Sequence, residues 1–372
     1  MRATLLRIMS LVRKEVLALV RDPRSRVILF APALIQSLVF GYAATFDLNN
    51  VPYAVFDEDN SAASRDLLAR LDGASAFVRV ANIDRAEDIA AMIDDRSALV
   101  AIRIGPDFAR DLAAGKPANV QVIVDGRNSN TAGTAIGYIS AIIDGFNADW
   151  RASHGLPGPL VSVAVRAWYN ENLETSWNMI PGLIGTITLL QVLLLTALSV
   201  AREREDGTFD QLLVTPIRPT EIMIGKALPS TIIGLIQATI IFLVAQLWFQ
   251  IPFAGTLLTL YVGLLFFVVS AVGIGLFVSS LVNTMQQAML FSFILLMPFI
   301  LLSGLTTPIG NMPWVFQWIT FIDPLRYAID ITRRVYLEGA TLADLAGDLW
   351  PMAVIAVVTL PIASWMFRNR LA

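Results

Sequence analysis

Few residues in this chain of 372 could carry out chemistry. It has no cysteine and one histidine, His154, which excludes thiol catalysis, disulfides and a histidine-cluster metal site. Two Gly-Lys pairs occur, Gly115–Lys116 and Gly225–Lys226, whereas a phosphate-binding P-loop requires the pattern G-x-x-x-x-G-K-[ST]. Neither lysine is followed by serine or threonine. The sequence therefore predicts no nucleotide site, and no catalytic residue is assigned.

One acidic cluster, Asp57, Glu58 and Asp59, follows a short apolar run. Three adjacent carboxylates could hold a cation. Acidic side chains at the start of a helix also serve as a solvated turn and N-cap. Both interpretations stay open at this point, and no metal site is assigned.

The bulk composition indicates a membrane protein. Hydrophobic residues make up 56% of the chain and charged residues 15%, with a mean hydropathy of +0.64. Soluble domains contain about a quarter charged residues. The net charge of −3 offers no basis for a nucleic-acid partner. We expect an α-helical polytopic membrane protein.

Apolar segments long enough to cross ~30 Å of hydrocarbon predict six transmembrane helices. These segments are 27–46, 177–200, 230–250, 255–282, 286–305 and 350–368. Gly273 and Gly275 in the fourth would permit close helix approach.

Residues 47–176 have the composition of a soluble domain inserted between the first two spans. Their pattern predicts strands alternating with helices, an α/β domain with a mostly parallel or mixed sheet. The expected strands are 52–56, 76–80, 98–104 and 119–124, and the expected helices are 60–71, 85–93, 106–113 and 131–150.

The charged segment 201–229 lies between the second and third spans. Its apolar residues need the spans or another protein to cover them. Its E-R-E-x-G-T stretch (Glu203–Thr208) and the following L-L-x-T-P stretch (Leu212–Pro216) resemble the cytosolic coupling loop of ABC-2 type exporter permeases. That resemblance implies docking onto a separate ATPase subunit. The coupling residues it implies are Glu203, Arg204, Glu205, Gly207, Thr208, Gln211 and Leu212.

Residues 1–26 form an amphipathic basic segment, which predicts a helix lying in the membrane interface. Pro23 is expected to end this helix and turn the chain into the membrane. The segment resembles the interfacial helix of the same permeases in its K-E and R-D-P groups, which are Lys14, Glu15, Arg21, Asp22 and Pro23.

Residues 306–340 are too polar and proline-broken for a straight span and too apolar for an exposed loop. We expect an outward-facing re-entrant region, covered by protein where its backbone is broken. The residues Pro324, Arg326 and Tyr327 fit a P-L-x-Y-A motif that resembles the same family. Asp323 and Arg326 are expected to pair at the rim.

Basic residues concentrate in 1–26, 201–229 and the last residues of the chain, which places these segments in the cytosol by the positive-inside rule. Both termini are then cytosolic and 47–176 is periplasmic or extracellular. The resemblance implies a bacterial inner-membrane location.

The function expected is a permease subunit that moves a hydrophobic drug-like compound or lipid outward. The resemblance implies no cofactor on this chain, with ATP and Mg²⁺ on ABC ATPase subunits. It also implies a second permease, identical or different. A periplasmic adaptor and membrane lipids are further expected partners. Two alternatives remain open: a membrane-anchored receptor or scaffold acting through 47–176, and an ATP-independent channel or secondary transporter.

Overall fold

The computed structural model describes residues 2–21, 23–43, 48, 50–127, 129–155, 174–205, 207 and 219–369. The chain divides into two compact units. One comprises Met1–Thr45 and Ala167–Ala372, and the other comprises Phe46–Arg166. Each is described separately.

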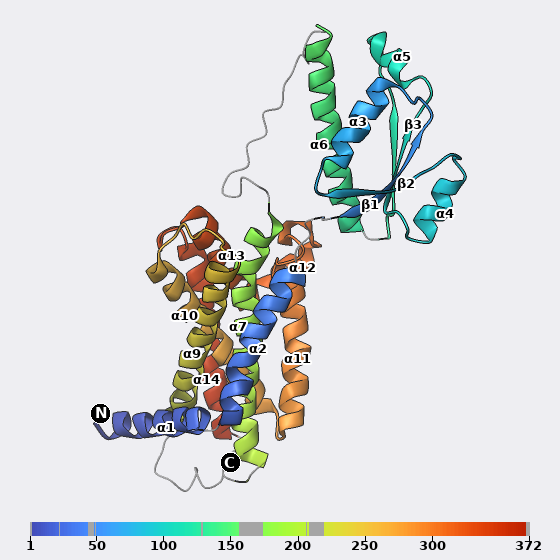
Figure 1. The fold of residues 1–372 in the computed structure, drawn as a ribbon. Coiled ribbons are helices and arrows are strands. Elements are labelled where there is room, and N and C mark those ends of the chain that lie inside the picture. Colours follow the sequence, from blue (N-terminus) through green and yellow to red (C-terminus); the bar gives the residue numbers. More distant parts are fainter. Residues whose placement is uncertain are drawn as a thin grey trace. The chain divides into compact units, whose positions relative to one another are not determined.

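The first unit is a helical bundle (Figure 1). Within the described residues, five helices are long and apolar enough to cross a membrane, and Phe30–Tyr42 is a shorter apolar helix. The five lie in α7 (Thr175–Glu205), α9 (Pro219–Leu243), α10 (Leu257–Leu281), α11 (Met285–Leu302) and α14 (Ala346–Asn369). They are preceded in the chain by α1 (Arg2–Arg21) and α2 (Pro23–Ala43), which contains the shorter apolar helix.

Helix α10 lies at the centre of the bundle and contacts α7, α9, α13 and α14. Its glycines allow this packing, as the sequence predicts. A Cβ at Gly273 would collide with Thr359 of α14, and one at Gly275 would collide with Thr196 of α7. The apolar core runs through all these helices and includes Phe267, which is fully buried.

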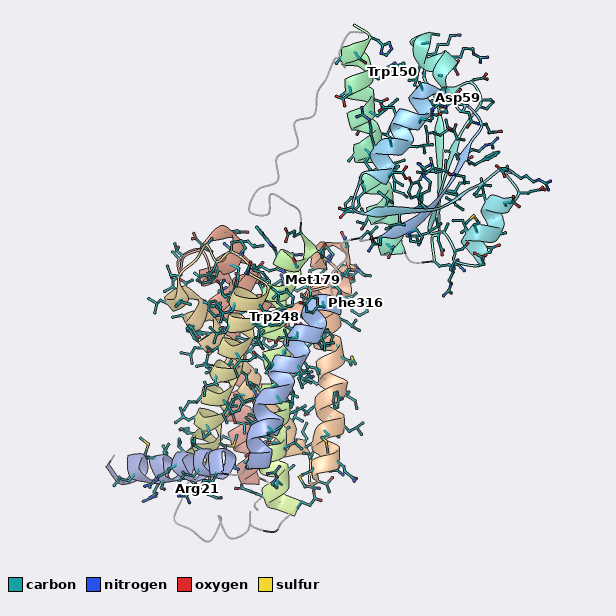
Figure 2. All side chains as sticks on the ribbon, viewed as in Figure 1. Arg21, Asp59, Trp150, Met179, Trp248 and Phe316 are labelled. Carbon is teal, nitrogen blue, oxygen red and sulfur yellow. The ribbon has the colours of Figure 1, made fainter. Side chains whose placement is uncertain are left out.

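Helix α1 runs across one end of the bundle, and α2 runs along the bundle from that end (Figure 1). Because α1 ends at Arg21 and α2 begins at Pro23, the predicted change of direction at this proline is confirmed. Figure 2 shows Arg21 at this end and Met179, Trp248 and Phe316 at the opposite end. These residues mark the two ends of the bundle.

Two helices extend into the predicted loop 201–229. Helix α7 continues to Glu205, and α9 begins at Pro219 and passes without a break into the expected third span. Arginine and glutamate are good helix formers, and proline is favoured in the first helical turn. The third span is thus part of a helix that begins at Pro219, eleven residues before the predicted start of the span at residue 230.

The end of the bundle opposite α1 consists of short helices, as the proline-broken sequence predicts. They are η2 (Ile309–Asn311), α12 (Trp314–Ile319), η3 (Thr320–Ile322), α13 (Pro324–Arg333) and η4 (Arg334–Glu338), and the π-turn η1 (Val244–Trp248) ends α9 at this level. Trp314 and Trp318 are exposed here.

The second unit is the predicted α/β domain. Its strands are β1 (Val51–Asp57), β2 (Phe77–Asn82), β3 (Val100–Ile104) and β4 (Val120–Val124). They form a sheet in the order β2-β1-β3-β4, in which only β4 is antiparallel. The helices are α3 (Ala62–Asp72), α4 (Asp88–Asp94), α5 (Phe108–Ala113) and α6 (Ser129–Ser153). Every predicted strand and helix of this unit is present.

Asp57 forms the turn before α3, whereas the neighbouring Glu58 accepts from Arg103 at 2.9 Å and Asp59 from the Ala109 N–H at 3.3 Å. The Asp57 Oδ1 accepts backbone N–H groups of Asp59 and Asn60, both at 3.1 Å, and its Oδ2 accepts the Ser64 hydroxyl at 2.7 Å. Ser61 is the N-cap of α3, in a reciprocal capping box with Ser64. Among the described residues no group of acidic or histidine side chains has the arrangement of a metal site.

Candidate functional site

A buried lysine joins three helices at the α1 end of the bundle. The Lys226 side chain is 5% exposed and comes from the second turn of α9. Its Nζ lies 2.8 Å from the Glu203 Oε2 of α7 and donates to the Glu15 Oε1 of α1 at 3.2 Å. It also donates to the Ser199 hydroxyl at 3.1 Å. We call Lys226, Glu203, Glu15 and Ser199 the lysine junction.

Two further ion pairs tie α1 to the same helices. Lys14 of α1 donates to the Glu203 Oε1 at 3.2 Å, on the solvent side of the junction. Arg7, two turns earlier, lies 3.4 Å from the carboxylate of Glu221, which is buried. Burying either glutamate carboxylate without a cation beside it would cost free energy of folding. The ion pairs therefore fix where α1 lies on α7 and α9.

Close backbone approach of α1 and α9 depends on Gly225. A Cβ at this position would lie 2.8 Å from the Leu11 Cβ. Real Cβ atoms do not approach this closely, so any larger residue requires α1 to shift. Gly225 thus allows α1 to pack closely on α9, and Lys226, the next residue, makes the ion pairs.

The end of α7 is also bound to the rest of the bundle. The Arg204 guanidinium donates to the Val282 carbonyl at 2.7 Å and lies 5.2 Å from the Phe367 ring centroid of α14. The Glu205 carboxylate accepts the Met285 backbone N–H, at the start of α11, at 2.9 Å. Adjacent residues on α7 therefore contact α9 and α1 on one side and α10, α11 and α14 on the other.

Gly207 ends α7. It has a φ of +68°, which favours glycine, and its N–H donates to the Arg204 carbonyl at 3.1 Å. The remaining predicted residues Asp22, Thr208, Gln211 and Leu212 lie outside the described residues. Arg21 is exposed at the end of α1.

At the end of the bundle opposite α1, the expected Asp323–Arg326 ion pair is not formed. Asp323 is buried and caps α13, accepting the Leu325 N–H at 2.8 Å, with Pro324 in the first helical position. Arg326 instead donates to the Thr320 hydroxyl and lies over the rings of Phe321 and Tyr327. The carboxylate points at the backbone that it caps and the guanidinium toward the aromatic rings, so the two charges do not meet.

Sequence reasoning missed Lys226, Glu221 and Arg333. Arg333 donates to three carbonyls, those of Asn178, Gly304 and Leu305, and so joins α7 to the turn after α11. One signal was available for Lys226: an isolated lysine at the start of a long apolar helix requires an acidic partner.

A sequence model described as an ABC-2 family transporter protein matches residues 26–365. The chain belongs to the ABC-2 family of transporter permeases. It is 43% identical over 365 residues to the probable multidrug ABC transporter permease YbhR of Escherichia coli (strain K12), covering 98% of this chain and 99% of that protein.

The permease is also similar to two other full-length relatives from the same strain. It is 29% identical to the probable multidrug ABC transporter permease YbhS, over 98% of this chain and 97% of that protein. It is 28% identical to the inner membrane transport permease YhhJ, over 93% and 95%.

Membership in this family makes the chain a multi-pass membrane protein that is not itself an ATPase. An ABC permease acts with an ATPase subunit.

Proposed function

We propose that this permease is the membrane-spanning half of an ATP-driven exporter, and that residues 201–219 receive the force of the ATPase. The observation that carries the proposal is the lysine junction. Lys226 and Glu203 stand on either side of the segment 206–218 and are held together by an ion pair of 2.8 Å. A load on that segment would therefore move α7, α9 and α1 together.

The contacts of Arg204 and Glu205 support transmission of this force from α7 to other helices of the bundle. Through them the end of α7 holds the Val282 carbonyl, the Met285 N–H and the Phe367 ring. A displacement of α7 would then be passed to α10, α11 and α14. The complementary anchor at the other end of the bundle is Arg333.

The orientation proposed puts α1 and the end of α14 in the cytosol, with six membrane-crossing helices in total, α2 being the sixth. The basic residues of α1 support this by the positive-inside rule. The unit Phe46–Arg166 then lies outside the membrane. It would be available there to a periplasmic adaptor, in a bacterial inner membrane.

The cargo proposed is a hydrophobic small molecule, drug-like or lipid. The apolar spans of this chain and the "probable multidrug" description of YbhR and YbhS support this class. Both of those proteins match this chain over nearly their whole length, which supports pairing with a second, non-identical permease. ATP and Mg²⁺ would be bound by the ATPase subunits alone.

The test is reconstitution into proteoliposomes with the ATPase subunit that co-purifies with the permease. The variant is Glu205→Ala, which removes the carboxylate that holds the Met285 N–H. We expect the complex to form normally, while ATP-dependent movement of a hydrophobic fluorescent dye falls severalfold.

The matched control is Glu338→Ala at the opposite end of the bundle, which loses only an exposed pair with Arg334. It should transport normally. Unchanged transport by Glu205→Ala would contradict the coupling role, and dye movement by the permease without its ATPase would contradict ATP-driven export.

A further inference from the structure

An open groove of about 750 Å³ lies between α9, α10 and α14. One wall is a single face of α9, on which Met223, Ala227 and Thr231 follow one another at helical spacing. Leu265 of α10 and Leu360 of α14 are among the apolar residues opposite. The groove is lined almost entirely by carbon, and nothing in the candidate coupling site uses it.

The depth of the groove matches one leaflet of a bilayer. Its α9 wall extends from Thr220 to Thr231. At 1.5 Å per residue this wall is ~16 Å long, which is about half of the ~30 Å hydrocarbon thickness. A hydrocarbon chain of one leaflet would lie along it for most of its length.

The mouth of the groove is at the end of the bundle that α1 crosses. Thr220 is in the first turn of α9 and Trp365 in the last turns of α14, so both lie at this end (Figure 1). Trp365 is 57% exposed, and tryptophan prefers the level of the lipid headgroups. Helix α1, which crosses this end, carries the exposed Arg13, and cations at this level attract anionic headgroups.

The groove also opens sideways through exposed apolar residues. Ile224, Leu228 and Leu265 line it and are 45%, 44% and 42% exposed. In a membrane-spanning bundle such side chains face hydrocarbon. The acyl chain of a lipid could therefore enter the groove directly from the bilayer, without passing through the protein.

We propose that this groove binds one acyl chain of an anionic phospholipid from the leaflet on the α1 side. The bound acyl chain would support the α9 face that carries Met223 and Ala227, beside the residues that hold α1 and α7. Met223 and Ala227 face the groove, whereas Glu221 and Lys226, their neighbours in sequence, are bound to α1 and α7. This inference does not depend on what the permease transports.

The experiment uses the full-length permease in nanodiscs that contain phosphatidylglycerol with a photoreactive diazirine in the middle of one acyl chain. Adducts are mapped by peptide mass spectrometry. We expect labelling of the groove segment around Leu228 to exceed that around Val357 by about tenfold, the ratio given by a preference of ~1.4 kcal/mol. Val357 is 70% exposed on α14 and does not line the groove.

Ala227→Phe should lower labelling of the groove to the level at Val357, whereas Val357→Phe, which adds bulk outside the groove, should leave it unchanged. Labelling of the unmodified chain decides the question even if Ala227→Phe fails to fold. Equal labelling at Leu228 and Val357 would overturn the proposal. Equal labelling by the matching phosphatidylcholine probe would overturn the anionic preference.

Discussion

Replacing Lys226 by methionine tests the lysine junction directly. The substitution keeps the length and apolar stem of the side chain and removes the ammonium group. It leaves the carboxylates of Glu203 and Glu15, whose side chains are only 12% and 19% exposed, without this cation. We expect the contact of α1 with α7 and α9 to weaken.

The magnitude follows from burial. Removing one partner of a fully buried ion pair costs about 3–5 kcal/mol. Here both carboxylates keep some contact with solvent, and Glu203 retains Lys14 at 3.2 Å. The expected loss is therefore near the lower end, about 3 kcal/mol. If it falls on the local opening of α1, amide exchange in this helix should accelerate by about 150-fold.

The assay is hydrogen–deuterium exchange of the permease in nanodiscs, followed over peptides of α1 and the start of α9. Lys14→Met is the matched control, because it makes the same change, beside the same Glu203, at a side chain that is 56% exposed. Exposed pairs contribute less than about 1 kcal/mol, so exchange should change by less than about fivefold. Equal effects of the two substitutions would refute the reasoning, because burial distinguishes them.

Three further substitutions test other parts of the structure. Gly225→Leu should push α1 away from α9, because a Cβ there meets Leu11 at 2.8 Å, and should lower thermal stability by about 1–3 kcal/mol, with partial recovery when Leu11→Ala is added. Asp57→Ala removes the acceptor of the Ser64 hydroxyl and two backbone N–H groups, and should speed amide exchange at the start of α3 by about tenfold. Burial, helped by the hydrogen bond to Asp72, raises the pKa of Tyr53 from 10.0 to about 12, so the α/β unit should lose stability as the pH rises through that interval, and Tyr53→Phe should abolish this pH dependence.

The α/β unit could be predicted in detail because its signals are local. Strands alternate with capped helices, and Ser61 and Asp57 lie where a helix start requires them. Helix ends in the bundle were less predictable. Charged residues normally mark the end of a span, yet Arg202–Glu205 continue α7 because arginine and glutamate favour helix. Composition indicates which segments lie in lipid and which in water, but it does not reveal the residue at which a helix ends.

Only part of the candidate site could be predicted from the sequence. Glu203 and Glu15 were selected through motifs, but the lysine that joins them comes from a third helix. No spacing rule connects positions so far apart in the chain. The opposite error occurred with Asp323 and Arg326, which are close in sequence and were expected to pair. Each is bound by nearer groups, a backbone N–H in one case and the Thr320 hydroxyl in the other.

The use of charge at the lysine junction is itself informative. Well-packed apolar side chains of the same volume would stabilise a helix contact at least as well as a buried ion pair, because they carry no desolvation cost. An ammonium group bound to carboxylates of two different helices instead fixes the position of both, since a shift of one turn leaves a buried charge unpaired. Gly225 places α1 close enough for this geometry, and Glu15 and Glu203 set its position along the bundle. Such a contact resists sliding more than an apolar one does, which is what transmission of force through α7 and α9 requires.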